Sequence, residues 1–297
     1  MYLTKRFLIM EAMQLLGRRG HCRTPAIALV CVCSCVLSLI SLARPAAAPA
    51  AASVLDSVLL RGMLRVGAPA DYEPFAAMVP NGQVIGSDID SARALATSLG
   101  VRLTVVRTTW SSLVDDLRAG HFDLAVGGIT ATMLRWRSVA FSAPYHDGVK
   151  VLVGRCGSEA LATLTRLGIS AANHSNVSFA VNPGGTNEQL IRARFGGARL
   201  RVVARNGEQF GVVRGGEAEL TVTDDVEALI QHQKAGVGAL CIGPQLAHSS
   251  QPKAFMLPRD DGPWLRYVDA FLSARTAGGE ASASLDEWIA AFSSSSA

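Results

Sequence analysis

A glutamate follows a glycine-rich turn in the run from Asn182 to Glu188, which reads Asn-Pro-Gly-Gly-Thr-Asn-Glu. The turn predicts a helix in which Thr186 is the N-cap residue and Glu188 lies in the first turn. Free backbone N–H groups near Gly185 would suit a carboxylate ligand. Glu188 could act as a general acid if its pKa is raised. The alternative is a first-turn acid paired with Arg192, and the residues alone favour that pairing.

Cationic and hydroxyl side chains suggest how a carboxylate could be bound. The planar guanidinium of Arg135 can bind a carboxylate through two hydrogen bonds, although Arg135 could also be an ordinary surface residue. Thr130 and Thr132 could donate to the same carboxylate or cap a loop. Lys150 could contact a substrate or serve only in structure.

Three aromatic residues could form an apolar wall against a substrate ring: Tyr72, Phe75 and Trp110. Phe75 is the weakest of these candidates, because a single aromatic side chain is more often part of a core. Trp110 lies between a predicted strand and a predicted helix, in the kind of loop that often carries function.

Acidic side chains gather where another strand meets a helix. Asp224 ends the predicted strand, and it could contact a ligand. Asp225 and Glu227 follow at the helix start, where acids are favoured by the helix dipole, and we expect both to be solvated.

The elements that position these residues alternate between strand and helix. Apolar periodicity and turn residues predict helices at 55–64 (ending near Gly62), 90–99, 111–118 and 187–195 and from 225, and strands at 64–67, 102–106, 122–126, 178–181, 199–203 and 220–223. This alternation predicts βαβ units and a largely parallel sheet. Because the rhythm occurs twice, we expect two α/β lobes with a ligand cleft between them.

The first residues of the chain have the pattern of a secretory signal. Arg18, Arg19 and Arg23 precede an uncharged stretch at 26–43, and alanine-rich sequence follows. The stretch is slightly long for a cleaved signal, so a retained membrane anchor is the alternative. A start at Met13 would give a signal of ordinary proportions.

Composition narrows the class of protein. Of the 297 residues, 49% are hydrophobic and 18% are charged, which excludes a disordered or collagen-like chain. The formal charge of +4 belongs to the first 43 residues, and the remainder has equal numbers of basic and acidic residues. We therefore expect no nucleic-acid partner.

Cysteine use agrees with export from the cytoplasm. Four of the six cysteines lie in the leader, which leaves Cys156 and Cys241. In an oxidising compartment these two most simply form a disulfide, and two buried free thiols are the alternative. No spacing of cysteine or histidine suggests a metal site. Sequons at Asn173 and Asn176 matter only if the host glycosylates secreted proteins.

Several segments, in order, resemble periplasmic amino-acid-binding proteins of the family 3 type. They are 64–67, 71–75, Gly86 with 88–90, 128–130 continuing to Arg135, and 141–145. The resemblance extends from about 55 to 288. It implies a type II, two-lobed periplasmic-binding-protein-like fold with two crossovers. The expected organisation is a leader and linker at 1–52, lobe 1 at 53–148, lobe 2 at 149–247, and a return to lobe 1 at 248–297.

A second set of residues is similar to an enzymatic branch of that family, the cyclohexadienyl dehydratases. The set comprises Thr109-Trp110, Lys150, 182–188, Thr223-Asp224 with Glu227, and 257–260, and Cys156 and Cys241 also match cysteines of that enzyme. The resemblance implies that prephenate is converted to phenylpyruvate, or arogenate to phenylalanine, with loss of carbon dioxide and water. It implies Glu188 as the general acid. Ser87, in place of a usual aromatic residue, is one departure.

The main alternative function is a non-catalytic amino-acid receptor of a transporter. In such proteins the acid at the position of Asp224 holds the ligand's α-ammonium group, which arogenate has and prephenate lacks. A sensor ectodomain is a third alternative. We expect a periplasmic or secreted protein that needs no cofactor and meets a membrane only through an uncleaved leader. The sequence leaves open the preferred substrate and whether the chain forms a homo-oligomer.

Overall fold

The computed structural model describes residues 52–168 and 177–294. The predicted leader and the sequons at Asn173 and Asn176 therefore lie outside the described residues. Within the described residues, no helix has the length and apolar character needed to cross a membrane.

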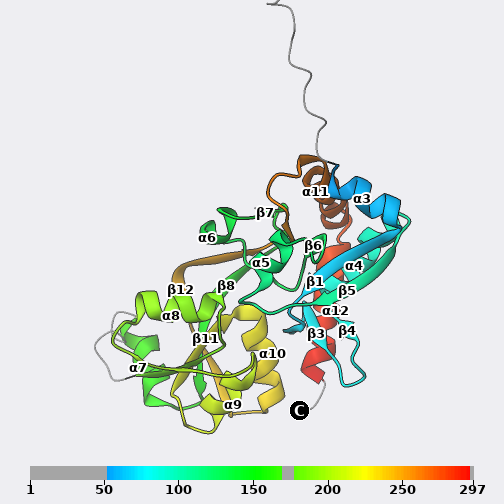
Figure 1. Ribbon diagram of the computed structural model, residues 1–297. Coiled ribbons are helices and arrows are strands. Elements are labelled where there is room, and N and C mark those ends of the chain that lie inside the picture. Colours follow the sequence, from blue (N-terminus) through cyan, green and yellow to red (C-terminus); the bar gives the residue numbers. More distant parts are fainter. Residues whose placement is uncertain (1–51, 169–176, 295–297) are drawn as a thin grey trace, which may run out of the picture. The chain divides into compact units, whose positions relative to one another are not determined.

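The first of two five-stranded sheets has the order β5-β1-β6-β13-β7. Figure 1 labels four of these strands, β5, β1, β6 and β7. Its strands are β1 (Met63–Ala68), β5 (Arg102–Arg107), β6 (Leu124–Ala125), β7 (Ala140–Phe141) and β13 (Met256–Leu257). β1 pairs in parallel with β5 and β6, whereas β13 is antiparallel to both β6 and β7. We refer to this sheet and the helices packed on it as the first lobe.

The helices of the first lobe are α3 (Val54–Arg61), α4 (Ser87–Ser98), α5 (Leu113–Arg118), α6 (Met133–Trp136) and α11 (Gly262–Ala277). α3 begins where the Ser53 hydroxyl accepts a hydrogen bond from the Leu55 N–H, and it ends at Gly62, whose φ of 66° favours glycine. Trp264 of α11 is fully buried, and its indole N–H donates to the Asp123 carbonyl at 3.0 Å. The last part of the chain therefore helps to build the first lobe.

The second lobe is built on the sheet β10-β9-β11-β8-β12. Its strands are β8 (His146–Arg155), β9 (Ser178–Val181), β10 (Arg199–Val202), β11 (Leu220–Asp224) and β12 (Leu240–Lys253). β10, β9 and β11 are parallel, and β8 and β12 are antiparallel additions. The helices are α7 (Glu159–Leu167), α8 (Thr186–Arg194), α9 (Glu208–Arg214) and α10 (Asp225–Ala235). Phe179 and Phe195 pack together in its core, with ring centroids 5.0 Å apart.

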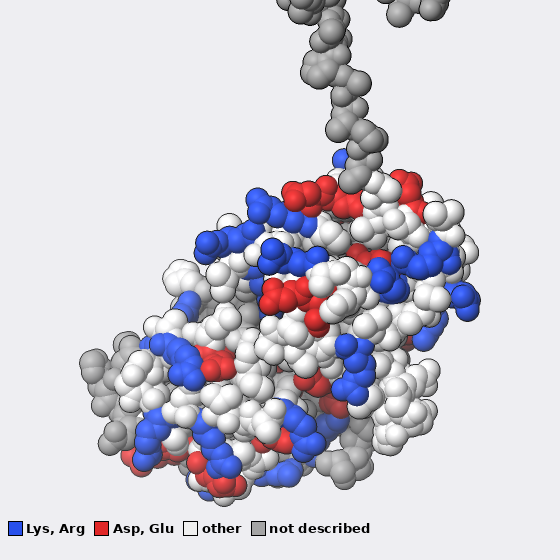
Figure 2. Space-filling view, in the orientation of Figure 1, with Lys and Arg blue, Asp and Glu red and all other residues white. Residues whose placement is uncertain are grey.

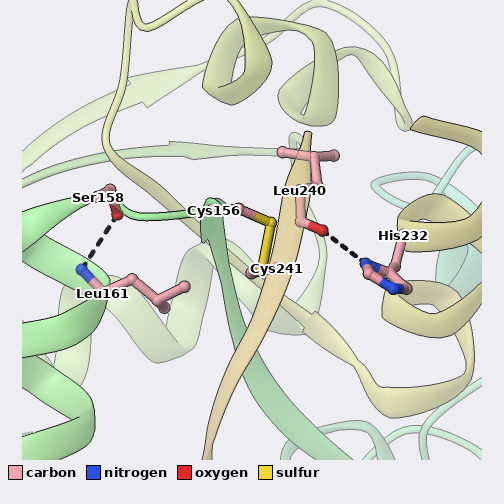
Figure 3. Close-up of a disulfide and its surroundings, with 6 residues drawn as sticks. All are labelled: Cys156, Ser158, Leu161, His232, Leu240 and Cys241. Atoms are coloured by element: carbon pink, nitrogen blue, oxygen red, sulfur yellow. Dashed lines mark hydrogen bonds between the residues drawn. A yellow bond between two sulfur atoms is a disulfide. The ribbon is translucent and has the colours of Figure 1, made fainter. Parts of the chain in front are cut away.

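A disulfide joins the two long strands of the second lobe (Figure 3). Cys156 directly follows β8, and Cys241 lies near the start of β12, with their Cα atoms 4.8 Å apart. The bond closes a loop with a sequence separation of 85. The predicted pairing of these two cysteines is confirmed.

The C-terminal helix α12 (Glu280–Ser294) packs against α4 of the first lobe and α10 of the second. Phe292 of α12 belongs to a buried cluster with Val226 and Ile230 of α10. The indole N–H of Trp288 donates to the Asp90 carboxylate at 2.7 Å. Nearby, β2 (Asp71–Tyr72), β3 (Ala76–Met78) and β4 (Val84–Ile85) form a small antiparallel sheet.

The predicted strands and helices of the parallel parts agree with the structure to within a few residues. The expected single, largely parallel sheet was wrong, because there are two large sheets and each is mixed. β13 is antiparallel to its neighbours β6 and β7, and β8 is antiparallel to its neighbours β11 and β12. β12 escaped prediction because Gly243, Pro244 and Pro252 interrupt it, and such residues normally argue against a strand. The expected lobe boundaries at 148/149 and 247/248 fall inside β8 and β12, and they stay predictions.

Candidate functional site

A small cavity lies between the two lobes. Side chains and backbone from both lobes line it: Tyr72, Trp110, Gly128, Thr130, Arg135, Lys150, Asn182, Gly185, Thr186, Asn187, Asn206, Asp224, Glu227 and Lys253. Most of the substrate-binding residues expected from the sequence therefore meet in one place. Two of the expected site residues, Thr132 and Glu188, are outside this lining.

Asp224 is the centre of a buried charge cluster. It ends β11, opposite Lys150 on the antiparallel strand β8. Its Oδ1 lies 2.8 Å from Lys150 Nζ, and its Oδ2 lies 2.7 Å from Lys253 Nζ and accepts a hydrogen bond from the Tyr72 hydroxyl. Burial alone would raise the pKa of Asp224, but the two ammonium groups hold it well below its usual range. Asp224 is therefore ionised, with cations at both oxygens.

The two lysines are almost entirely inaccessible, with side chains 1% exposed. Lys253 Nζ also donates to Thr130 Oγ1 at 3.1 Å and thereby connects Asp224 to the first lobe. Burial lowers the pKa of Lys253, although the Asp224 charge opposes this change. The sequence analysis did not select Lys253, because the strand that positions it, β12, was not recognised.

Arg135 lies on the short helix α6 at the first-lobe side of the cavity. Its Nη1 donates to the Thr130 carbonyl at 3.0 Å, and burial lowers its pKa to about 10. Thr132 is the N-cap residue of α6 and accepts from the Arg135 N–H at 3.3 Å. Of the two roles that the sequence allowed for Thr132, capping is therefore the one observed, while Arg135 keeps other N–H donors for a ligand.

Glu188 lies on α8 beside the cavity. The N-cap residue is Gly185 rather than the predicted Thr186, because the helix already begins at Thr186. Glu188 Oε2 accepts from the Gly184 N–H at 3.0 Å, and Oε1 accepts from Arg192 Nε at 2.9 Å. These hydrogen bonds lower the pKa of Glu188. The structure therefore contains the pairing with Arg192 that was the alternative interpretation, and the role of Glu188 as a general acid stays a prediction.

Glu227 is a buried carboxyl group of the cavity lining whose pKa is raised. The expectation that it is solvated was wrong: it is 5% exposed and lines the cavity from the first turn of α10. Burial raises its pKa to about 7, with a further contribution from the Asp224 charge, although a hydrogen bond from the Thr223 hydroxyl opposes this. First-turn acids usually face solvent. Here β11 ends at the cavity, so the first turn of α10, which follows it directly, lines the cavity.

Its neighbour Asp225 is partly buried, and its Oδ1 accepts a hydrogen bond from the Val149 N–H at 3.4 Å. Asp225 is therefore not fully solvated either, but it is outside the cavity lining.

Aromatic side chains form one wall of the cavity. The rings of Tyr72 and Trp110 meet edge to face, with centroids 6.1 Å apart. The Trp110 indole N–H donates to Asp71 Oδ1 at 2.8 Å, which fixes the orientation of the ring. Phe75 packs behind Tyr72 with centroids 5.1 Å apart, and it is fully buried outside the cavity lining.

Two consecutive glycines, Gly127 and Gly128, lie next to this aromatic wall, and Gly128 lines the cavity. The N–H groups of Gly127 and Gly128 donate to Asp88 Oδ2 at 2.7 and 2.8 Å, and the Tyr145 hydroxyl donates to the same atom at 2.6 Å. Gly128 has a φ of +67°, and a Cβ there would lie 2.7 Å from the Tyr72 ring. Only glycine fits at this position.

A hydrogen bond and an ion pair also connect the two lobes outside the aromatic wall. Asn206 Nδ2 donates to the Asp71 carbonyl at 2.8 Å. Lys234 of α10 pairs with Glu73 at 2.7 Å. The visible face of residues 52–168 and 177–294 carries both acidic and basic side chains (Figure 2), and these residues contain no cluster suited to a metal ion.

Comparisons with known proteins agree with this arrangement. Residues 64–291 match the bacterial extracellular solute-binding proteins, family 3. A cyclohexadienyl dehydratase of Pseudomonas aeruginosa is 36% identical over 237 residues, which cover 79% of this chain and 85% of that protein. An L-cystine-binding protein of Escherichia coli is 24% identical over 80% of this chain and 86% of its own length.

Solved structures of related binding proteins have the same fold. The crystal structure of an ancestral amino-acid-binding protein, described as a precursor of cyclohexadienyl dehydratase, has a TM-score of 0.72 and 32% identity. The match covers 80% of this chain and all of that structure. The predicted two-lobed α/β fold is confirmed.

Proposed function

The chain belongs to the bacterial extracellular solute-binding proteins of family 3, and from this premise we propose that it is a cyclohexadienyl dehydratase. The reaction removes carbon dioxide and water together from a cyclohexadienyl dicarboxylate. The observation that carries the proposal is a protonatable carboxyl group, Glu227, buried in a cavity that also contains Arg135, Lys150 and Lys253.

The reaction requires that a proton be donated to the oxygen of the ring hydroxyl. Prephenate carries a ring hydroxyl opposite a ring carboxylate, and hydroxide alone is a poor leaving group. When an acid protonates the hydroxyl, the C–O bond breaks and water leaves. The bond to the ring carboxylate breaks at the same time, its electrons enter the ring, and carbon dioxide leaves. Aromatisation of the ring drives the reaction, and solvent returns the proton to the acid.

Glu227 is the proposed proton donor. With a pKa of about 7, a substantial fraction of this carboxyl is protonated near neutral pH. A bound dianion would raise that fraction, because nearby negative charge disfavours a second ionised carboxylate. The resemblance assigned this role to Glu188, and the lowered pKa of Glu188 makes it the weaker candidate.

The remaining groups have the chemistry to hold the substrate. Arg135 and the Thr130 hydroxyl can bind one carboxylate, with Lys150 and Lys253 supplying further positive charge. The backbone N–H groups of Gly185 and Thr186, at the start of α8, suit another carboxylate.

The substrate ring would lie against Tyr72 and Trp110. We place the protein outside the cytoplasm, in the periplasm, which fits its family and its disulfide.

An amino-acid receptor is the competing function. It is favoured by the likeness to an ancestral amino-acid-binding protein, at 32% identity. A receptor has no need of a protonated carboxyl directed at its ligand, so Glu227 argues for the enzyme.

The test is the appearance of phenylpyruvate, followed by ultraviolet absorbance, after prephenate is added to the purified protein. Glu227→Gln should lower kcat by about 10²-fold or more with little change in KM, and Glu188→Gln serves as the matched control. Loss of turnover in Glu188→Gln alone would return the acid role to that residue. No turnover by the wild type, together with micromolar binding of an amino acid, would establish the receptor.

A further inference from the structure

The negative charge of Asp224 is neutralised by two lysines of the cavity lining. Lys150 Nζ lies 2.8 Å from Oδ1 as an ion pair outside hydrogen-bond geometry, and Lys253 Nζ lies 2.7 Å from Oδ2. The Tyr72 hydroxyl also donates to Oδ2. With Arg135 included, three cationic side chains line the cavity against the ionised Asp224 and the partly protonated Glu227. The cavity lining therefore carries an excess of positive charge.

The two candidate substrates differ at a single group. Both have a ring carboxylate and a side-chain carboxylate, but prephenate carries a 2-oxo group where arogenate carries a 2-ammonio group. A ketone oxygen accepts a hydrogen bond from a lysine. An ammonium can only donate, and it is repelled by a neighbouring lysine. To bind well, the ammonium needs an oxygen of an ionised carboxylate that no other cation occupies.

Resting on the proposed function, we infer that the site selects the 2-oxo acid over the 2-amino acid, and that Lys253 sets this selection. Lys253 occupies the Asp224 oxygen that an incoming ammonium would require, and its second bond, to Thr130, holds it there. Lys150 lies on the other oxygen, in register across β8 and β11. Removal of Lys253 would free Oδ2 for an ammonium while Lys150 still partly neutralises Asp224.

The experiment compares kcat/KM for prephenate and arogenate, measured side by side. The wild type should prefer prephenate by at least about tenfold, because the two substrates differ by a full charge close to buried cations. Lys253→Met should lower kcat/KM for prephenate and shift the ratio toward arogenate by about tenfold or more. Lys234→Met is the matched control, because Lys234 pairs with Glu73 outside the cavity lining, and its ratio should equal that of the wild type.

The outcomes separate the two claims. Turnover of both substrates with equal kcat/KM would overturn the selection while leaving the dehydratase intact, as would an unchanged ratio in folded Lys253→Met. Turnover of neither substrate would refute the proposed function. In that case the selection is tested by calorimetry, which compares the affinity of the wild type for phenylpyruvate with its affinity for L-phenylalanine. The same comparison is used if thermal unfolding shows that Lys253→Met does not fold. Tighter binding of phenylpyruvate would support the selection, and equal affinities would overturn it.

Discussion

The buried carboxyl of Glu227 should leave a signature in the stability of the protein. Its pKa is raised from 4.5 to about 7, so between these values the folded state holds a proton that the unfolded state has released. The contribution of this carboxyl to the free energy of unfolding is therefore fully present below pH 4.5, where it is protonated in both states. The contribution is lost as the pH rises through about 7, where the folded state must ionise it as well. At about 1.4 kcal/mol for each pH unit, the loss amounts to about 3 kcal/mol.

Glu227→Gln tests this directly, because glutamine keeps the shape of a protonated carboxyl and can still accept from Thr223. Urea denaturation of both proteins at several values between pH 4 and 8 gives the difference in free energy of unfolding. The wild type should lose about 3 kcal/mol relative to Glu227→Gln across this range, and the difference should level off above pH 7.

Glu188→Gln is the internal control, and its sign is opposite. The lowered pKa of Glu188 means that its contribution is present above its unfolded pKa and is lost as the pH falls. A difference between wild type and Glu227→Gln that stayed constant from pH 4 to 8 would refute the reasoning, because Glu227 would then ionise as readily in the folded protein as in the unfolded chain.

Three further outcomes are expected. The kcat/KM for prephenate should fall as the pH rises through about 7, because the proton donor becomes ionised, and a profile flat from pH 6 to 8 would contradict that assignment. The double variant Cys156→Ser/Cys241→Ser should lose about 2–5 kcal/mol of unfolding free energy, measured in denaturant, with kcat retained, because neither cysteine lines the cavity. Gly128→Ala should cost about 1–3 kcal/mol and weaken substrate binding in a KM measurement. Gly120→Ala, at a φ of +74° with open space for a Cβ, should show only the smaller backbone cost and an unchanged KM.

Local patterns in the sequence were enough for the parallel parts of both sheets. β9 was predicted at its observed bounds, and β1, β5 and β10 to within one residue, because short apolar runs between turn residues have few alternative structures. α4 starts at Ser87, three residues before the predicted start at 90, because Gly86 rather than a side chain serves as its N-cap. The antiparallel additions were missed because their pairing depends on partners far away in the chain.

The site residues also divide into those that local sequence predicts and those that depend on the whole fold. Arg135, Lys150, Trp110 and Asp224 were selected from residue type and resemblance, and all line the cavity. The different surroundings of the two glutamates could not be predicted, because both occupy the first turn of a helix after a strand or turn. Only the fold determines that the Glu227 side chain is the buried one of the two.

The position of β13 has a consequence for how the protein is made. This strand lies between β6 and β7, yet it comes more than one hundred residues after them in the chain. A nascent chain that has produced only the first four strands of that sheet leaves β6 and β7 with unpaired edges. Native pairing there must wait until residue 257 has been synthesised, so the first lobe stays incomplete until most of the chain exists.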